Sequence, residues 1–367
     1  MIQKYQFGLK ELAGIFNYLS AENYQNIGPK ARDGAIMIEA LSSFNDMAQG
    51  YHEEIEKGHY RINDKQDGSL FQYTVGPQSF KKYLNPARRK LWGAKKNGNG
   101  FKVIPEETTP PKMALWGIRS CDISSIDILD HVFMGDYEND WYRAARNNLL
   151  VIAVGCTTCS SNCFCTSMGT GPMPENNYDL LITEVTGENH YFICETGSEN
   201  GEKIANVLRF PKAKKEDVSE ALNRVKQVEE KMSKRFNPEE AAVILKDNIE
   251  SPHWDEVAKR CLSCANCTLV CPTCFCSSTE DVTDVTGDHT ERWLRWDSCF
   301  NGDFSYLHGG NIRNTTKSRY RQWMTHKLSS WYDQFGSSGC VGCGRCITWC
   351  PVGIDLTEEL LSIKSTK

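Results

Sequence analysis

The sequence lacks several features that would assign a protein to a common class. Its 367 residues contain no apolar run of about eighteen, so a membrane-spanning helix is excluded. The 42 basic residues are outnumbered by 47 acidic ones, and the net charge of -5 excludes a chain that coats nucleic acid over its whole surface. Residues 1–14 lack the apolar segment of a secretory signal peptide, so we expect a cytoplasmic location.

The short motifs of nucleotide-binding and hydrolytic sites are also missing. No G-x-G-x-x-G follows a predicted strand and no G-x-x-x-x-G-K-[ST] is present, so we expect no dinucleotide or P-loop site in this chain. The 8 histidines form no H-E-x-x-H pair. We therefore predict no catalytic residues, and the sequence leaves open whether the chain is an enzyme.

Cysteine is absent from residues 1–120 and abundant after them. Six cysteines lie from Cys121 to Cys194, and eleven from Cys261 to Cys350. The odd total of 17 cannot be fully paired within one chain, and disulfide frameworks belong to small secreted domains rather than to a chain long enough for two domains. We therefore expect free thiols whose main role is to bind metal.

Apolar segments predict an α/β domain over residues 1–212. Residues 113–118 and 149–155 are expected to be buried strands, with two helices between them, at 124–133 and 140–148. The further expectations are a cap of the first of these helices at Ser124 or Ser125, an amphipathic helix over 9–19, mainly loops and turns over about 50–110, and paired strands at 178–185 and 190–196.

The rest of the chain is expected to be helical. Residues 213–260 predict a helical linker, whose charged first part presents one apolar face, and helix starts are expected at Asn237-Pro238 and Ser251-Pro252. Residues 261–367 predict an α-helical, two-cluster ferredoxin-like domain with a long insertion over 272–339. The apolar face of the first linker helix is expected to consist of Val218, Leu222, Val225 and Met232.

The most specific pattern is C-x2-C-x2-C-x3-C followed by proline, which occurs twice. It is typical of bacterial ferredoxins, because the two-residue steps let three thiolates reach one 4Fe-4S cubane and the longer step carries the fourth toward the neighbouring cluster. The alternative is a pair of zinc sites, although zinc requires neither the third cysteine nor the proline. The pattern predicts one cluster on Cys261, Cys264, Cys267 and Cys350 and another on Cys340, Cys343, Cys346 and Cys271.

The insertion carries three more thiols and a basic segment. Cys274, Cys276 and Cys299 could ligate or flank a cluster or replace one of its ligands, but buried packing thiols are favoured because the two motifs already supply eight ligands. Residues 311–330 are basic with interleaved aromatic residues, so nucleic-acid binding must be considered. The negative net charge disfavours it, and a face for an acidic redox partner or a solvated helix is preferred.

The remaining cysteines follow the predicted strands of the first domain. Cys121 and Cys156 come after the carboxyl ends of two strands, which is where open α/β sheets bind ligands. Cys159, Cys163 and Cys165 lie in the loop that follows. Their spacing leaves zinc, a 4Fe-4S cluster and unligated thiols all open.

The strings RSCD, CFCTSMGTGP, CPTCFC, RWDSC and HGG, together with the two ferredoxin motifs, occur in an order that resembles a known family. It is the 4Fe-4S dicluster family of the beta (iron–sulfur) subunits of soluble nickel–iron sulfhydrogenases and of the corresponding iron–sulfur component of anaerobic sulfite reductase, and the resemblance covers roughly residues 110–357. It implies a third 4Fe-4S cluster and places Cys159 outside the family's pattern. It also keeps the role of Cys274, Cys276 and Cys299 open. The implied ligands of the third cluster are Cys121, Cys156, Cys163 and Cys165.

The resemblance also implies a function. It suggests an iron–sulfur subunit that relays single electrons between a flavin/NAD(P)-binding subunit and the catalytic subunit of a cytoplasmic nickel–iron hydrogenase. The expected partners are the hydrogenase large and small subunits and the flavin/NAD(P) subunit, in a hetero-oligomer. The alternatives are the iron–sulfur component of an anaerobic sulfite reductase and a non-enzymatic iron–sulfur regulatory protein.

Overall fold

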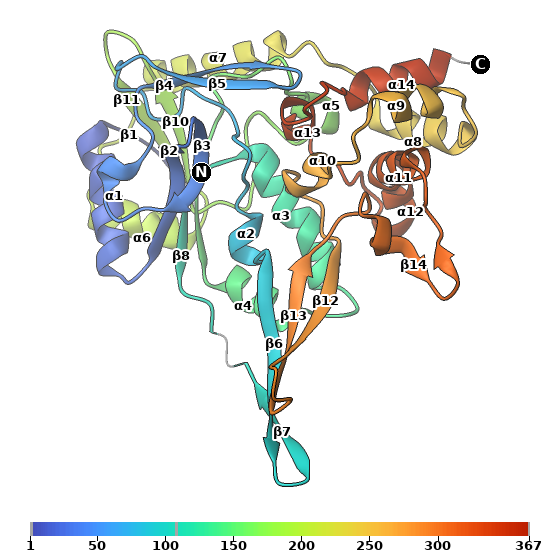
Figure 1. Cartoon of the computed structure of the whole chain (residues 1–367). Coiled ribbons are helices and arrows are strands. Elements are labelled where there is room, and N and C mark those ends of the chain that lie inside the picture. The colour runs from blue at the N-terminus through green and yellow to red at the C-terminus, as the bar shows by residue number, and fades with distance from the viewer. Residues whose placement is uncertain (1–2, 107–108, 366–367) are drawn as a thin grey trace.

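A seven-stranded sheet forms the first half of the molecule in the computed structural model, which describes residues 3–106 and 109–365 (Figure 1). The strands are β1 (Lys4–Phe7), β2 (Gln25–Arg32), β3 (Ala35–Ala40), β8 (Met113–Arg119), β9 (Leu149–Val154), β10 (Leu180–Val185) and β11 (Tyr191–Thr196). Their order is β1-β11-β10-β9-β8-β2-β3, with β2, β8, β9 and β10 parallel and the others antiparallel to their neighbours. The predicted α/β character, the two buried strands and the pairing of β10 with β11 are confirmed.

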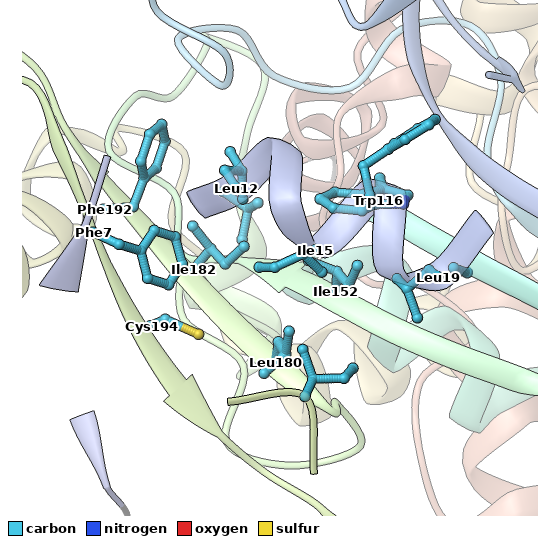
Figure 2. Close-up of a cluster of buried hydrophobic side chains, with 14 of the residues drawn as sticks. Phe7, Leu12, Ile15, Leu19, Trp116, Ile152, Leu180, Ile182, Phe192 and Cys194 are labelled. Atoms are coloured by element: carbon cyan, nitrogen blue, oxygen red, sulfur yellow. The ribbon is translucent and has the colours of Figure 1, made fainter. Parts of the chain in front are cut away.

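Helices cover both faces of this sheet. On one face lie α1 (Leu9–Ala21) and α6 (Glu199–Val207), and on the other lie α3 (Ser120–Phe133), α4 (Asp140–Asn147) and α7 (Lys215–Lys231). The predicted amphipathic helix is confirmed, because Leu12, Ile15 and Leu19 of α1 are buried against Ile152 and Ile182 of the sheet (Figure 2). Each such fully buried side chain stabilises the fold by about 1.5–3 kcal/mol.

The start of α3 differs from the prediction. The helix begins at Ser120, directly after β8 and with Arg119 as its N-cap residue, rather than at Ser124 or Ser125. Cys121 and Asp122 therefore lie in the first helical turn, where both side chains are buried. Residues 120–123 include polar side chains and show no apolar periodicity. The sequence pattern therefore placed the start of the helix one turn too late.

Residues 50–106 contain far more regular structure than the expected loops and turns. They form two hairpins, and the segment Asn97–Gly100 is the turn of the second, with Gly98 at a φ of 59°. Asparagine followed by glycine is a hairpin signal that the interpretation of this region as loops overlooked. The strands are β4 (Tyr51–Glu56), β5 (His59–Asp64), β6 (Arg88–Asn97) and β7 (Gly100–Pro105), with the short helices η1 (Phe44–Asp46) and α2 (Lys81–Leu84) beside them. Residues 107–108 lie outside the described part.

The insertion 272–339 pairs with strands from the first half of the chain. Its strands β12 (Ser277–Thr283) and β13 (His289–Trp296) join β6 and β7 in an antiparallel sheet of order β12-β13-β6-β7, which projects as an arm from the rest of the molecule (Figure 1). Thr290 pairs with Ala94, so residues nearly two hundred positions apart lie on adjacent strands. Such pairing could not be read from the local sequence. The remaining strands of the insertion are β14 (Tyr306–Leu307) and β15 (Gly310–Asn311), preceded by η2 (Gly302–Ser305).

Residues 213–260 are mainly helical, as predicted, but residues 261–367, which were expected to be α-helical, also contain the strands β12 to β15, because β13 pairs with the distant β6 and with β12. The side chain of Asn237 accepts hydrogen bonds from the N–H groups of Glu239 and Glu240, which confirms the helix start expected there. The second expected start also exists, because a helix begins at His253 after Pro252. The further helices of this part are α8 (Pro238–Asp247), α9 (His253–Arg260), α10 (Asn266–Leu269), α11 (Thr316–Thr325), the π-helical turn η3 (His326–Ser330), α12 (Trp331–Phe335), α13 (Arg345–Thr348) and α14 (Leu356–Ser365). The short helix α5 (Cys165–Met168) lies earlier in the chain, between β9 and β10.

Helix α7 is the first helix of the segment predicted as a linker, and it packs on the sheet. Ala221 lies against Val185 and Ile193 of β10 and β11, and Val225 is also buried. The expected apolar face is wrong at Leu222, of which 43% is exposed. The division at residues 212 and 260 stays a prediction. Among the described residues, no helix is long and apolar enough to cross a membrane.

Candidate metal centres

None of the seventeen cysteines forms a disulfide, and all of them lie in the described part of the chain. They gather in three groups at the junction of the two halves of the molecule, with Cys194 apart in the sheet core (Figure 2). The first group lines a cavity between α10, α11 and α13, together with the apolar side chains of Phe300 and Trp323. Its cysteines are Cys261, Cys264, Cys267 and Cys350, joined by Cys346.

These residues belong to opposite ends of the 261–350 segment, and the fold brings them together. Burial and then the charges of Cys261, Cys350, Cys264 and Cys271 raise the pKa of Cys267, so the thiol faces both motifs. Backbone N–H groups point at the sulfurs: Ser263 donates to Cys261 Sγ at 3.4 Å and Ile354 to Cys350 Sγ at 3.3 Å. Cys264 is the one exposed member of the group.

The second group contains the cysteines of the second motif and Cys271. Burial raises the pKa of Cys346, and the charges of Cys340, Cys343 and Cys271 raise it further. The Gly342 N–H donates to Cys340 Sγ at 3.5 Å. The structure therefore places Cys271 with the three cysteines that the crossed pattern assigns to it. Cys346 also lines the cavity of the first group, so the two groups are adjacent.

The third group lies at the carboxyl edge of the sheet. Cys121 comes from the first turn of α3, Cys156 follows β9, and Cys165 begins α5. Burial raises the pKa of Cys165, followed by the charges of Cys156, Cys163 and Cys343, and burial raises that of Cys163 to about 12. The four cysteines implied by the family resemblance are thus neighbours, and Cys343 of the second group lies beside them.

Cys159 lies beside this third group as well. Its Sγ is 3.8 Å from the Val228 carbonyl oxygen of α7, and it packs in the same apolar cluster as Cys121 and Cys163. Burial and the charge of Cys156 raise its pKa.

Two glycines of the second motif bring the groups together. A Cβ at Gly342 would lie 2.6 Å from backbone atoms of Phe164 and Cys165, and a Cβ at Gly344 would lie 2.4 Å from the Asn162 carbonyl oxygen. The Phe164 N–H donates to the Gly342 carbonyl oxygen at 2.9 Å. Backbone therefore packs directly on backbone here, and no side chain fits between the second and third groups.

A buried ion pair crosses the same junction. Arg345 donates through both terminal nitrogens to the carboxylate of Asp122 at 2.8 Å, and its Nε donates to the Gly76 carbonyl oxygen at 3.1 Å. Only 1% of the Arg345 side chain and 3% of that of Asp122 is exposed. Arg345 stands between Cys343 and Cys346, and Asp122 follows Cys121, so the pair links the second group to the third. Sequence reasoning missed both residues, although the motif position of Arg345 was a signal.

The three additional thiols of the insertion lie near Cys271. Cys274 lies beside Cys271, and Cys276 beside Cys299. The ammonium group of Lys327 faces all four of these thiols. The expectation that they are packing thiols remains a prediction.

The basic segment 311–330 is not a free basic face. Lys317 forms an ion pair with Asp255 at 2.8 Å, and Arg321 forms one with Glu250 at 3.0 Å. Lys327 is buried. The proposed docking face for nucleic acid or an acidic partner is therefore weakened, because acidic residues distant in the sequence neutralise part of its charge.

The donor set fits iron–sulfur clusters. Thiolates are the usual ligands of 4Fe-4S cubanes, and the apolar linings and N–H groups aimed at sulfur are the surroundings that tune such clusters. Within residues 3–106 and 109–365, no group of three or more His, Cys, Asp or Glu side chains is arranged to hold a single metal ion. Cubane ligands surround a whole cluster, each bound to a different iron.

Comparison with known proteins identifies a family and a relative. Residues 260–354 match the model of a family described as a 4Fe-4S dicluster domain. Over 275 residues the chain is 33% identical to sulfhydrogenase 2 subunit beta of Pyrococcus furiosus, covering 72% of this chain and 79% of that protein. No solved structure matches.

Proposed function

Because the chain belongs to the family of sulfhydrogenase beta subunits, we propose that it carries single electrons between a flavin/NAD(P)-binding subunit and the catalytic subunits of a nickel–iron hydrogenase. At the coarser level, it is an iron–sulfur electron-transfer subunit. The finer proposal includes a cytoplasmic hetero-oligomer with the hydrogenase large and small subunits. No catalytic residue is assigned in this chain.

The observation that carries the proposal is the serial arrangement of the three cysteine groups. Cys343 belongs to the second group and faces Cys121 and Cys165 of the third. Cys346 belongs to the second group and lines the cavity of the first. Three clusters in these positions would form a continuous path from the edge of the sheet to the exposed Cys264. Such a path suits a subunit that connects two redox partners.

The proposed ligands follow the three groups. One 4Fe-4S cluster would be held by Cys261, Cys264, Cys267 and Cys350, a second by Cys340, Cys343, Cys346 and Cys271, and a third by Cys121, Cys156, Cys163 and Cys165. A bound 4Fe-4S cluster supplies one-electron redox chemistry. The chain itself buries Cys121, Cys163, Cys165 and Cys271, partly covers the other proposed ligands except the exposed Cys264, and donates backbone N–H groups to three of the sulfurs.

Metal analysis tests the number of clusters. Protein purified without oxygen is expected to contain about twelve iron and twelve acid-labile sulfide per chain, because each cubane holds four of each. A value near eight would remove the third cluster, and zinc in place of iron would overturn the proposal.

Co-purification with a nickel–iron large subunit would support the hydrogenase assignment, whereas a sirohaem subunit in its place would contradict it.

A single substitution tests the third ligand group. Cys121→Ser is expected to lower the iron content from about twelve toward eight per chain, since serine binds cubane iron less well than thiolate. The matched control is Cys194→Ser, which alters a buried cysteine in the sheet core far from the groups. Equal iron loss in both variants would mean that misfolding, not ligand removal, is measured.

A further inference from the structure

Lys327 is a buried cation with an unusual set of partners. Its Nζ donates to Cys271 Sγ at 3.3 Å, to Thr273 Oγ1 at 2.9 Å and to the Gly339 carbonyl oxygen at 3.1 Å. The residue is 6% exposed and lies in the π-helical turn η3, a local irregularity that is frequent at functional sites. The partners that the described structure gives this ammonium group are a thiol, a hydroxyl and a carbonyl, with no carboxylate among them.

A buried ammonium group needs a compensating negative charge. Removing it from water is costly unless an anion lies close, and hydrogen bonds to neutral oxygens compensate only in part. The neighbouring Lys81 increases the positive charge, because its Nζ binds the carbonyl oxygens of Cys271 and Cys274 and lies 4.0 Å from the ring centre of Trp296. The atom able to carry the negative charge at hydrogen-bond distance from Lys327 Nζ is therefore the sulfur of Cys271.

The same network joins the two halves of the second cysteine group. Thr273 Oγ1 donates to the Gly339 carbonyl oxygen at 2.7 Å, and the Gly339 N–H donates to the Lys327 carbonyl oxygen at 2.8 Å. Gly339 precedes Cys340, and Thr273 follows Cys271 by two positions. Lys327 thus lies at the point where the fourth cysteine of the first motif meets the first cysteine of the second motif.

We propose that Lys327 is a positioning residue that hydrogen-bonds the Cys271 thiolate and raises the reduction potential of the cluster held by Cys271, Cys340, Cys343 and Cys346. This rests on the proposed function, because it requires a cluster at the second group. Adding one electron makes a cluster more negative, so a fixed positive charge and an N–H···S bond at its ligand favour the reduced form. No bond to iron is formed or broken in this step.

A redox titration of the whole protein, followed by electron paramagnetic resonance, tests the proposal. Lys327→Met is expected to lower the reduced-to-oxidised ratio of this cluster at least tenfold at a fixed potential, which for one electron corresponds to a shift of about 59 mV. Lys327→Arg keeps the charge and should restore most of the potential. Lys317→Met removes a partly exposed lysine of α11 that pairs with Asp255, and it should leave all potentials unchanged. The affected signal is identified as the one altered by Cys340→Ser.

Lys327→Gln keeps a donor for Thr273 and Gly339 without the charge, and it should show the same shift if the methionine variant does not assemble. On reconstitution in D2O, the iron–sulfur stretching band of this cluster should be displaced less in Lys327→Met than in the wild type, because the variant lacks the exchangeable Lys327 donor and keeps the Gly342 N–H. Unchanged potentials in Lys327→Met or Lys327→Gln would overturn the proposal. Loss of the cluster in both variants would also overturn it, because Lys327 would then be needed for folding. Absence of 4Fe-4S clusters from the wild-type protein would instead overturn the proposed function.

Discussion

Substitution of Gly342 by alanine is expected to abolish the third cluster while the other two remain. The added Cβ would lie 2.6 Å from backbone atoms of Phe164 and Cys165, and backbone cannot rotate away as a long side chain can. The loop that carries Cys163 and Cys165 must then move away from the second motif. Iron per chain should fall from about twelve to about eight, since one cubane of three is lost. Metal analysis and spin quantitation measure the effect.

The chain offers a close control for this substitution. Gly336 has a φ of 71°, near the 64° of Gly342, but no atom lies within 4 Å of its added Cβ. Gly336→Ala therefore imposes the left-handed backbone strain, about 1–2 kcal/mol, without the overlap, and should keep all its iron. If Gly336→Ala lost as much iron as Gly342→Ala, backbone strain rather than contact between the loops would be the cause.

The first motif shows that the left-handed conformation does not itself require glycine. Ser263 and Ala265 occupy the same positions as Gly342 and Gly344, with φ values of 52° and 65°. The two loops thus share these backbone conformations, and the second packs closely against the loop 162–165 at Gly342 and Gly344. The glycines are needed because another part of the chain approaches closely, and the sequence of the motif alone could not show this.

Substitution of Arg345 by methionine is expected to reduce the apparent free energy of unfolding by about 3–5 kcal/mol, because Asp122 would remain buried without its partner. Arg345 also donates to the Gly76 carbonyl oxygen, so a third segment loses its contact. Both effects occur where the second and third groups meet. Anaerobic urea unfolding of the cluster-loaded protein, followed by tryptophan fluorescence, gives the change.

Arg292 provides the comparison for this prediction. It also makes a two-bond ion pair, with Nε and one terminal nitrogen within 2.7 Å of the carboxylate of Asp281, but on the exposed arm. Arg292→Met should change stability little, because exposed pairs are solvated and screened. Similar losses in the two variants would show that burial of the Arg345 pair is not what stabilises the junction. Combining Arg345→Met with Asp122→Leu should recover stability relative to the single variant, since the unpaired charge is removed.

The success and failure of sequence reasoning follow the range of the interactions concerned. Strands β8 and β9 were predicted because a buried parallel strand is apolar along its whole length. Strand β6 was missed because the hairpin signal between β6 and β7 was overlooked and because its second partner, β13, comes from an insertion far along the chain. The first turn of α3 was missed because an aspartate such as Asp122 is also common in solvated loops. Asp122 is buried here because it pairs with Arg345, which the local sequence does not show.

The sequence by itself determined the chemistry of this protein. The spacing of the two ferredoxin motifs and the order of the family motifs indicated thiolate ligation of 4Fe-4S clusters, because cluster binding depends on short steps along the chain. Only the tertiary structure decided how the cysteine groups relate to one another. Glycine contacts, the Arg345–Asp122 pair and the burial of Lys327 join residues that are distant in the chain, and such contacts depend on the packing of whole elements. Their physical consequence is a series of three adjacent groups at one junction.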